Sequence, residues 1–390
     1  MSWPMVKLGD LFKVTSGGTP SRKKSEYYDG GDIHWVKTGD LHNKYVRTAS
    51  EFITQEGLDG SSARLYPKGT VLVAMYGATI GACSILDIEA ATNQACAAFT
   101  PTEKVEPVFL YYLLNHSKPA FVKAGSGGAQ PNISGTFLKN FEIPLPPLEE
   151  QKRIAAILDK ADAIRQKRKQ AIDLADEFLR SVFLDMFGDP VTNPKGWEVK
   201  RLEELISEGD KLNYGVVQPG DDDENGVPLV RSGDLYDSGT PLSKVRRVSS
   251  SVDEKHRKSR LKGNEILIAC VGSIGKVGWV DKSMVGWNIA RAVTRIPLRN
   301  SVNREYIFRY LQSPVIQGYF QKETRAVAQP TLNVGLISKT PVALPPQEQQ
   351  DEFLTVHNKV NKFKQKAILK SKHMDEMFKS LSQKAFSGQL

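Results

Sequence analysis

Two stretches of about forty residues, each free of proline and glycine, constrain this chain of 390 residues more than any other feature. The first begins at Leu148, directly after Leu145-Pro146-Pro147, and it runs to Phe187 before Gly188 and Pro190. Proline suits the residues just before a helix, and glycine is common just after its end. We therefore expect one continuous helix, which would be about 60 Å long at 1.5 Å per residue. Such a helix is too long to be buried inside one small domain.

The chain supplies a second stretch of the same kind. Leu344-Pro345-Pro346 repeats Leu145-Pro146-Pro147 at an offset of 199, and the helix pattern that follows runs to Phe386. Apolar residues recur along both stretches at steps of three, four or seven, which is the pattern of a coiled-coil seam. The predicted seam residues are Ile157, Ala161, Ile164, Phe178 and Val182 in the first helix, and Phe353, Val356, Val360, Phe363, Met377 and Leu381 in the second.

We expect the two helices to pair within one chain as an antiparallel coiled coil. Phe178 and Met186 near the end of the first helix would then lie close to Phe353 and Val356 at the start of the second. The alternative is that each amphipathic helix packs separately on a local core.

The segments before the two helices also repeat. Trp35-Val36-Lys37-Thr38-Gly39-Asp40-Leu41 matches Leu229-Val230-Arg231-Ser232-Gly233-Asp234-Leu235 at an offset of 194, and Asn93-x-Ala95 returns as Asn288-x-Ala290. Several matches in the same order indicate a tandem duplication. We divide the chain into two globular domains and two helices, with the ranges 1–147, 148–190, 191–346 and 347–390.

Each globular copy is predicted to be α+β with a mostly antiparallel sheet. Short β-branched and aromatic runs alternate with Gly, Asp, Asn and Ser turns, and one short helix follows late in each copy. The expected fold is therefore two homologous α+β domains separated by two long helices, with a pseudo-two-fold internal repeat.

Composition narrows the class of protein. The net charge is +9, and most of the excess lies in residues 191–346, which favours a polyanionic partner. The three cysteines, Cys83, Cys96 and Cys270, have no CxxC spacing, which favours reduced thiols in the cytoplasm and no zinc site. No apolar run reaches the length needed to span a bilayer, so no membrane association is expected.

Motifs for catalysis are missing. The Gly272–Val277 run lacks the spacing of a phosphate-binding loop and is predicted to be a tight turn. The chain has no Asn/Asp-Pro-Pro-aromatic tetrapeptide that could hold an adenine amino group, and no nucleophile elbow. We expect a non-catalytic protein without a metal site.

Duplicated polar residues are the candidates for DNA binding. Lys37 with Thr38, and Arg231 with Ser232, can reach a base edge or a phosphate; the alternative is a turn that caps its own backbone through Asp40 or Asp234. The amides of Gln94, Gln130, Asn132, Gln329 and Asn333 can read adenine, or can make ordinary loop hydrogen bonds.

A basic cluster in the second copy has no counterpart in the first. Its members are Lys244, Arg246, Arg247, Lys255, Arg257, Lys258, Arg260 and Lys262. We favour phosphate contacts for this cluster, in particular for Arg246, Arg247, Arg257 and Lys258, over a merely solvated face.

Taken together, these motifs carry a family resemblance. The Ser16-Gly17-Gly18-Thr19-Pro20 run, the Thr-Gly-Asp-Leu turn, the Gly127–Ile133 loop and the Leu-Pro-Pro-x-Glu-x-Gln helix openers are all present. The whole chain resembles the DNA specificity subunit of type I restriction–modification systems. The resemblance implies two target recognition domains that each read one half of a bipartite, asymmetric double-stranded DNA site, with the helices setting the spacing.

The resemblance also implies partners. Two methyltransferase subunits would dock around the helices and domains, and restriction/translocase subunits would join them. S-adenosylmethionine, ATP and Mg would belong to those partners, and this chain would bind no cofactor directly. The main alternative is a coiled-coil scaffold or adaptor that binds only proteins. A self-sufficient methyltransferase is disfavoured by the missing tetrapeptide.

Overall fold

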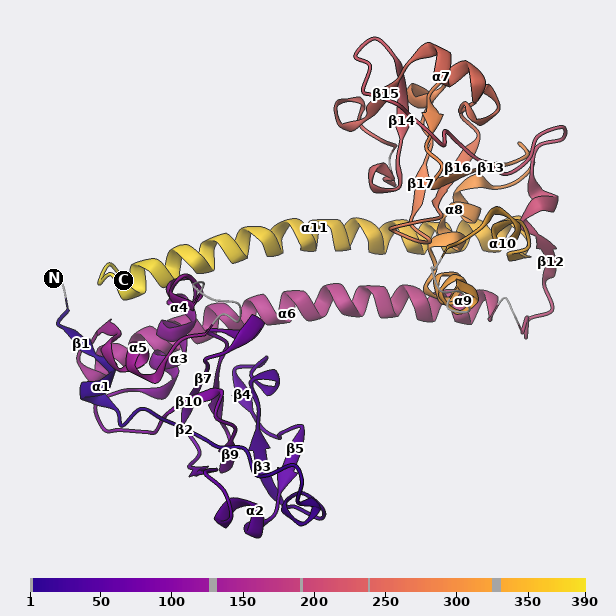
Figure 1. Ribbon diagram of the computed structural model, residues 1–390. Coiled ribbons are helices and arrows are strands. Elements are labelled where there is room, and N and C mark those ends of the chain that lie inside the picture. Colours follow the sequence, from indigo (N-terminus) through magenta and orange to yellow (C-terminus); the bar gives the residue numbers. More distant parts are fainter. Residues whose placement is uncertain (1–2, 126–131, 190–191, 238, 325–330) are drawn as a thin grey trace. The chain divides into compact units, whose positions relative to one another are not determined.

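The computed structural model describes residues 3–125, 132–189, 192–237, 239–324 and 331–390. It contains two uninterrupted helices of 40 residues, α6 (Leu148–Phe187) and α11 (Gln347–Phe386), which confirms both predicted long helices (Figure 1). The chain divides into two compact units. Unit 1 contains residues 1–170 and 368–390, and unit 2 contains residues 171–367, so each unit includes part of α6 and part of α11.

Unit 1 contains two main sheets and a short strand pair. The larger sheet has the order β2-β10-β7-β8-β4, the smaller has the order β5-β3-β9-β6, and β1 pairs with β11. Most neighbours are antiparallel, whereas β3 with β9 and β4 with β8 are parallel. The strands are β1 (Met5–Lys7), β2 (Thr15–Ser16), β3 (Ile33–Val36), β4 (Tyr45–Val46), β5 (Glu51–Ile53), β6 (Leu65–Tyr66), β7 (Val71–Ala74), β8 (Cys83–Leu86), β9 (Ala90–Thr92), β10 (Cys96–Phe99) and β11 (Glu142–Pro144).

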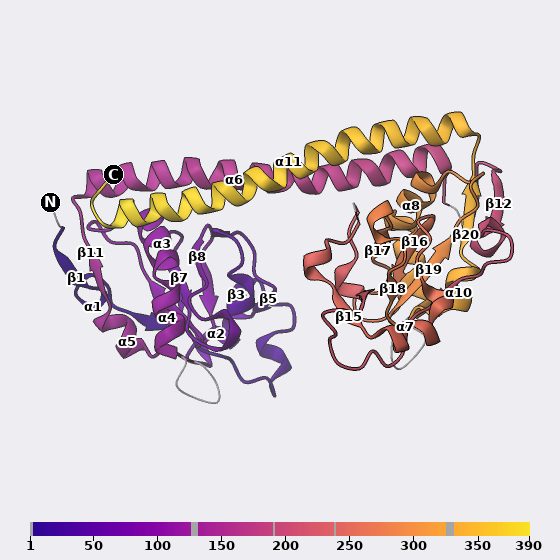
Figure 2. The same cartoon turned by 90° about the horizontal axis from the view of Figure 1, so that it is seen from above.

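The long helices belong to the core of unit 1. Its shorter helices are α1 (Leu8–Leu11), α2 (Gln55–Asp59), α3 (Pro107–His116), α4 (Lys118–Gly125) and α5 (Gly135–Asn140). Figure 2 shows α3 and β7 beside the long helices in this unit. One buried cluster joins Val73 of the sheet and Leu113 of α3 to Leu158 of α6 and Ala385 of α11. Within unit 1, the sheet and the long helices are thus held together by one continuous apolar core.

Unit 2 repeats this plan. Its sheets have the orders β13-β19-β16-β17 and β15-β14-β18, and β12 pairs with β20. Its strands are β12 (Glu198–Arg201), β13 (Asn213–Tyr214), β14 (Val227–Val230), β15 (Arg246–Val248), β16 (Glu265–Ala269), β17 (Val277–Trp279), β18 (Asn288–Ile289), β19 (Val293–Pro297) and β20 (Pro341–Leu344). Its shorter helices are α7 (Ser250–Lys255), α8 (Arg304–Gln312), α9 (Pro314–Thr324) and α10 (Val334–Ser338).

The two units match strand for strand over most of their sheets. The β2-β10-β7-β8 order of unit 1 returns as β13-β19-β16-β17, and β5-β3-β9 returns as β15-β14-β18, including the parallel pair. The predicted α+β class and internal repeat are therefore confirmed.

Close backbone approach explains the glycine after the second strand of each copy. A Cβ at Gly17 would lie 1.8 Å from the carbonyl oxygen of Thr92, and a Cβ at Gly215 would lie 1.7 Å from that of Ile289. Any side chain at these positions would overlap the neighbouring strand, so the motif is a packing requirement of the sheet.

The long helices pair antiparallel in each unit. In unit 1, Arg165 Nε lies 2.8 Å from Asp375 Oδ1, and in unit 2, Lys364 Nζ lies 2.5 Å from Asp176 Oδ1. Each of these positions on α11 is 199 residues after its counterpart on α6, so the ion pair is itself repeated. The predicted antiparallel pairing within one chain is confirmed.

The packed face of each helix lies beside the predicted seam for part of its length. Buried or half-buried residues follow steps of four and three: Ile154, Leu158, Ala161, Arg165, Arg168, Ile172, Ala175, Leu179, Val182 and Met186 on α6, and Phe353, His357, Val360, Lys364, Ala367, Ser371, Met374, Phe378, Leu381 and Ala385 on α11. Ala161, Val182, Phe353, Val360 and Leu381 were predicted and lie on these lines.

Six predicted seam residues do not lie on these lines, and four of the six are exposed. Ile164, Phe178, Phe363 and Met377 are 41%, 51%, 55% and 53% exposed, and Ile157 and Val356 are half-buried one position away from the packed line. The seam prediction was wrong for the four exposed residues. The packed line itself carries polar residues, so a search for apolar spacing selected their neighbours.

In unit 2, aromatic rings pack the end of α6 against the start of α11. The rings of Phe183 and Phe187 lie 5.9 and 5.1 Å from that of Phe353. Met186 packs against the same core, whereas Phe178, which we expected beside Phe353, is exposed. The end of α6 therefore packs beside the start of α11 as predicted, but the residues that contact Phe353 there are Phe183 and Phe187 instead of Phe178.

Candidate nucleic-acid interface

The Gly-Asp turn has the same conformation in both units. It forms one turn of 3₁₀ helix directly after β3 in unit 1 and after β14 in unit 2. The amide N–H of Lys37 donates to Asp40 Oδ2 (2.8 Å), and that of Arg231 donates to Asp234 Oδ2 (3.1 Å). Each turn therefore caps its own backbone, as the structural alternative for these residues predicted.

The cations beside these turns are already paired with carboxylates. Lys37 Nζ and the guanidinium of Arg22 both donate to Glu51, and their hydrogen bonds hold the pKa of Glu51 below its usual value, Lys37 having the larger effect. Arg231 contacts Asp234 through Nε at 2.9 Å and Nη2 at 3.3 Å. A phosphate would have to compete with these carboxylates for Lys37 or Arg231.

The hydroxyl and amide candidates differ in accessibility. Thr38 and Ser232 are half-buried, and Gln94 is exposed. Gln94 Oε1 accepts a hydrogen bond from the hydroxyl of Thr19, which leaves its amide NH₂ on an exposed side chain. Gln94 is therefore the better placed of these three to meet a base edge.

The loop before each long helix supplies the remaining amides. Asn333 is the N-cap of α10, where its Oδ1 accepts from the N–H of Leu336 at 2.9 Å, so it makes an ordinary loop hydrogen bond. Asn132 is exposed and lies in an isolated β-bridge with Tyr76. Gln130 and Gln329 lie outside the described residues.

The basic cluster of unit 2 divides into two groups. Arg246 and Arg247 are half-buried, and their guanidiniums donate to the carbonyls of Gly220 and Gly226. These arginines hold the loop that carries the acidic run Asp221-Asp222-Asp223-Glu224. The run places four acidic residues in the same loop as the carbonyl of Gly220 that Arg246 contacts.

The second group presents exposed cations. Lys255, Arg257 and Lys258 are exposed at the end of α7 and in the 3₁₀ turn that follows, and the side chain of Arg257 is 69% exposed with Glu254 at 3.5 Å. Arg260 is paired with Asp253 and Glu254, and Lys262 is paired with Asp210 at 2.8 Å. The side chain of Lys244 is not described. Of the four arginines and lysines favoured for phosphate contacts, Arg257 and Lys258 are the accessible ones.

A buried polar network supports the exposed group. Asn288 is fully buried, and its Nδ2 donates to Asp253 Oδ1 (2.8 Å) while its Oδ1 accepts from Ser259 Oγ (2.6 Å). Asp253 also accepts from Arg260. Because every member is bonded, the network holds the basic turn rigidly against β18. The repeated Asn-x-Ala motif was the available sequence signal for this network.

A second surface in unit 2 was not predicted. Ser273, Lys276, Gln317 and Gln321 line an open hollow of about 550 Å³ beside the Gly272–Gly275 turn. Lys276 Nζ donates to the carbonyl of Gly233 at 3.3 Å, so the hollow adjoins the Ser232 turn. Gly272 and Gly275 have φ of 78° and 80°, as expected for the predicted tight turn.

In the described part of the chain, no group of three or more His, Cys, Asp or Glu side chains could hold a metal ion. All three thiols are buried, and burial raises the pKa of Cys83 and Cys96 to about 12. Within the same residues, none of the helices combines the length and apolar character needed to cross a membrane.

Comparison with known proteins identifies the family. Residues 2–174 and 194–372 each match the model of the type I restriction modification DNA specificity domain. The EcoBI specificity subunit of Escherichia coli is 28% identical over 381 residues, covering 90% of this chain and 78% of that protein. The MjaIX specificity subunit of Methanocaldococcus jannaschii is 34% identical over 224 residues, covering 52% of this chain and 51% of that protein.

Solved structures agree on the fold. A chain from a study of complex assembly and conformational transition of the type I R-M system superposes with a TM-score of 0.63 at 19% identity, covering 100% of this chain and 98% of that one. A crystal structure of a type I S subunit from M. genitalium gives a TM-score of 0.56 at 15% identity, covering 98% and 96%.

Two recognition folds joined by paired helices define a DNA-targeting subunit rather than an enzyme. The chain belongs to the family of type I restriction–modification DNA specificity subunits, whose members recognise the DNA target and are non-catalytic. The resemblance drawn from the sequence is confirmed.

Proposed function

We propose that this subunit recognises a bipartite, asymmetric DNA target, with one half-site for each recognition domain. One observation carries the proposal. The two units share the strand order over most of their sheets and the same 3₁₀ turn after β3 and β14, but the cation beside the turn is paired differently, Lys37 with Glu51 and Arg231 with Asp234. A common framework with different side chains is what two readers of different half-sites require.

The partners follow from the same proposal. Two methyltransferase subunits bind the helices and recognition domains, and restriction/translocase subunits join the complex in the cytoplasm. One solved relative was studied for assembly of the type I R-M system, which supports a multisubunit role. S-adenosylmethionine, ATP and Mg would belong to those partners, as the family membership of this chain implies for a specificity subunit.

The test is the methylated motif in cells that carry this chain and its methyltransferase partner. We expect two short specified segments separated by unspecified base pairs. Replacing residues 1–147 with the corresponding domain of a relative should change one segment only, because the two recognition folds have separate cores. A motif that is continuous, or that changes in both halves, would contradict the proposal. A chain that shows no salt-dependent retardation of DNA would favour the protein-only scaffold.

A further inference from the structure

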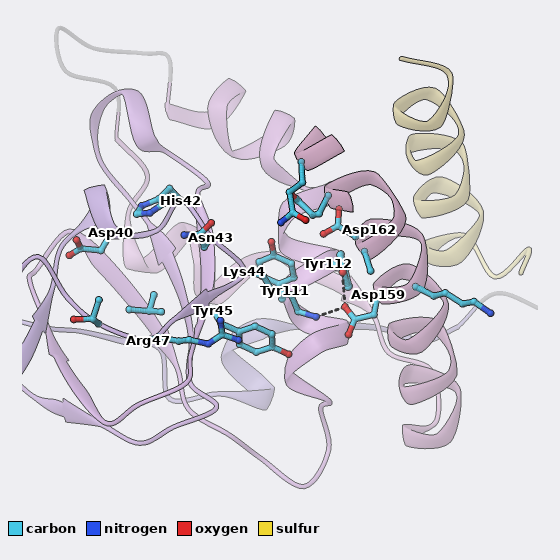
Figure 3. Close-up of a pocket in the computed structure, with 16 residues that line it drawn as sticks. Asp40, His42, Asn43, Lys44, Tyr45, Arg47, Tyr111, Tyr112, Asp159 and Asp162 are labelled. Carbon is cyan, nitrogen blue, oxygen red and sulfur yellow. Dashed lines mark hydrogen bonds and ion pairs between the residues drawn. The ribbon is translucent and has the colours of Figure 1, made fainter. Parts of the chain in front are cut away.

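A cleft of about 890 Å³ in unit 1 lies between the segment around β4 and the long helix α6. Side chains that line it include Asn43, Lys44, Arg47, Tyr111, Asp159 and Gln166. Figure 3 shows Lys44 reaching from the recognition fold toward Asp159 of α6, with Tyr112 of α3 meeting the same carboxylate.

The contact at Asp159 is a partly buried, three-residue connection. Lys44 Nζ forms an ion pair with Asp159 Oδ1, and the hydroxyl of Tyr112 donates to the same oxygen at 2.6 Å. The side chain of Lys44 is 16% exposed and that of Asp159 is 43% exposed, so the pair is shielded from water mainly on its lysine side. We call Lys44, Asp159 and Tyr112 the latch.

Aromatic rings surround the ammonium group of the latch. Lys44 Nζ lies 5.0, 5.8 and 5.1 Å from the ring centroids of Tyr45, Tyr111 and Tyr112. A cation within about 6 Å of a ring gains from the ring quadrupole, and the gain increases as water is excluded. The position therefore suits a lysine and disfavours a neutral side chain of the same length.

The latch joins the recognition fold to the helix pair. On one side, Lys44 directly precedes β4, the edge strand of the five-stranded sheet, and follows the turn that ends at Asp40. On the other side, the ring of Tyr112 lies 6.1 Å from that of Phe378 on α11, and Arg165 of α6 lies 4.4 Å from the same Phe378 ring. The edge strand is thus coupled to both long helices.

The described residues around the corresponding place in unit 2 make different contacts. The residue 199 positions after Asp159 is Asn358, which donates to Glu305 of α8 at 3.1 Å. The segment after the turn is held instead by Asp237, which accepts from Arg309 and Gln312, also of α8. The two units thus hold the segment after the turn with different contacts, and in unit 1 that contact reaches the long helix α6.

We propose that the latch positions the first recognition domain on α6 and thereby restricts the number of base pairs allowed between the two half-sites. This inference rests on the proposed bipartite function. The three residues are positioning residues, because they act through the orientation of the recognition fold and not through contact with DNA. Without the latch the β4 edge can tilt on α6, and a recognition domain that tilts tolerates more than one separation.

The experiment uses the full chain assembled with its methyltransferase partner. The variants are Lys44→Met, which keeps the aliphatic stem under the rings, and Asp159→Asn, which keeps the shape of the side chain. The matched control is Lys68→Met, because Lys68 is paired with Asp87 at 2.7 Å in the same domain but is 70% exposed. Substrates carry the wild-type half-sites at the natural separation and at one base pair more or fewer.

The readout is the ratio of kcat/KM at the natural separation to kcat/KM at the altered ones. We expect this ratio to fall about fivefold in both latch variants, the size typical of one partly desolvated cation contact. The control should stay within about twofold of wild type, as for an exposed ion pair.

Three results would distinguish a failure of this inference from a failure of the bipartite function. Folded latch variants that keep the wild-type ratio would overturn the inference while leaving the bipartite function intact. A wild-type complex that methylates single half-sites equally well would instead refute the bipartite function. If Lys44→Met lowers the melting temperature, Tyr112→Phe gives a second measurement, because it removes only the hydroxyl that donates to Asp159; an unchanged ratio there would also overturn the inference.

Discussion

Lengthening both long helices by one heptad should lengthen the unspecified gap in the target. The interhelix ion pairs define where the insertions belong. Arg165 pairs with Asp375, and Asp176 pairs with Lys364, so eleven steps forward along α6 correspond to eleven steps back along α11. Matched insertions therefore fall after Gln170 in α6 and after Leu369 in α11. Seven residues keep the four-and-three pattern of the packed face in register.

The size of the effect follows from helix geometry. Seven residues add about 10 Å to each helix. Base pairs are about 3.4 Å apart along one strand, so the addition corresponds to about three base pairs if the helices run along the duplex. Any tilt between helix and duplex shortens the projection. We expect a gap longer by about one to three base pairs, with unchanged half-site letters.

The assay is methylome sequencing in cells that express the variant with its methyltransferase partner. Inserting the same seven residues into α6 alone is the control, because it displaces one packed face against the other and should abolish modification. An active double-insertion variant that keeps the original gap would refute the idea that the helices set the spacing.

Further predictions concern stability, pH and salt. Phe187→Ala should lower the free energy of unfolding by about 3–5 kcal/mol in a denaturant titration, because Phe187 is 1% exposed between Tyr306 and Phe353, whereas Phe178→Ala should change it by under about 0.5 kcal/mol. Burial, and then the charge of Arg309, lower the pKa of His357 from its usual 6.5, so the unfolded chain binds the proton more readily. Stability should thus fall as pH drops below about 6.5, and His357→Leu should flatten that dependence in melting curves at pH 7.5 and 5.5. Replacing Arg257 and Lys258 with glutamine should lower the log–log salt slope of DNA binding by up to about two.

The architecture could be predicted because its signals are local and repeated. Paired prolines mark the start of each long helix, and a forty-residue stretch without glycine or proline has few alternatives to a helix. The offset of 199 between the two Leu-Pro-Pro sequences then related the halves to each other. None of these inferences required knowledge of which residues touch.

The packed face of the helices could not be predicted as well. A coiled-coil seam is predicted from the spacing of apolar residues, but Arg165, Arg168 and Lys364 occupy packed positions. Their salt-bridging or stem contacts are visible only in the paired structure. Ile164 and Phe178 are apolar and each lies one position away from a packed residue, so the apolar spacing predicted them as seam residues instead. Whether these two side chains are exposed depends on how the two helices pair, and the local sequence pattern does not determine that.

The candidate site shows a similar limit. Residue type correctly indicated cations near the turns after β3 and β14, but it could not show that Glu51 and Asp234 already engage Lys37 and Arg231. Glu51 comes fourteen residues after Lys37, on a strand whose register with β3 had to be known first. Which cations remain accessible to DNA is decided by such pairings.

The charged residues on the packed face also explain how a helix pair can keep a fixed length. A seam made only of Leu and Ile would bury more apolar surface, but it would allow the helices to slip by a heptad at little cost. In this chain, slipping would leave the half-buried Arg165 and Lys364 without Asp375 and Asp176. Polar residues at packed positions lower the stability of a coiled coil and fix its register. Under the bipartite function proposed above, the helix pair needs one register, and the repeated ion pair would supply it at some cost in stability.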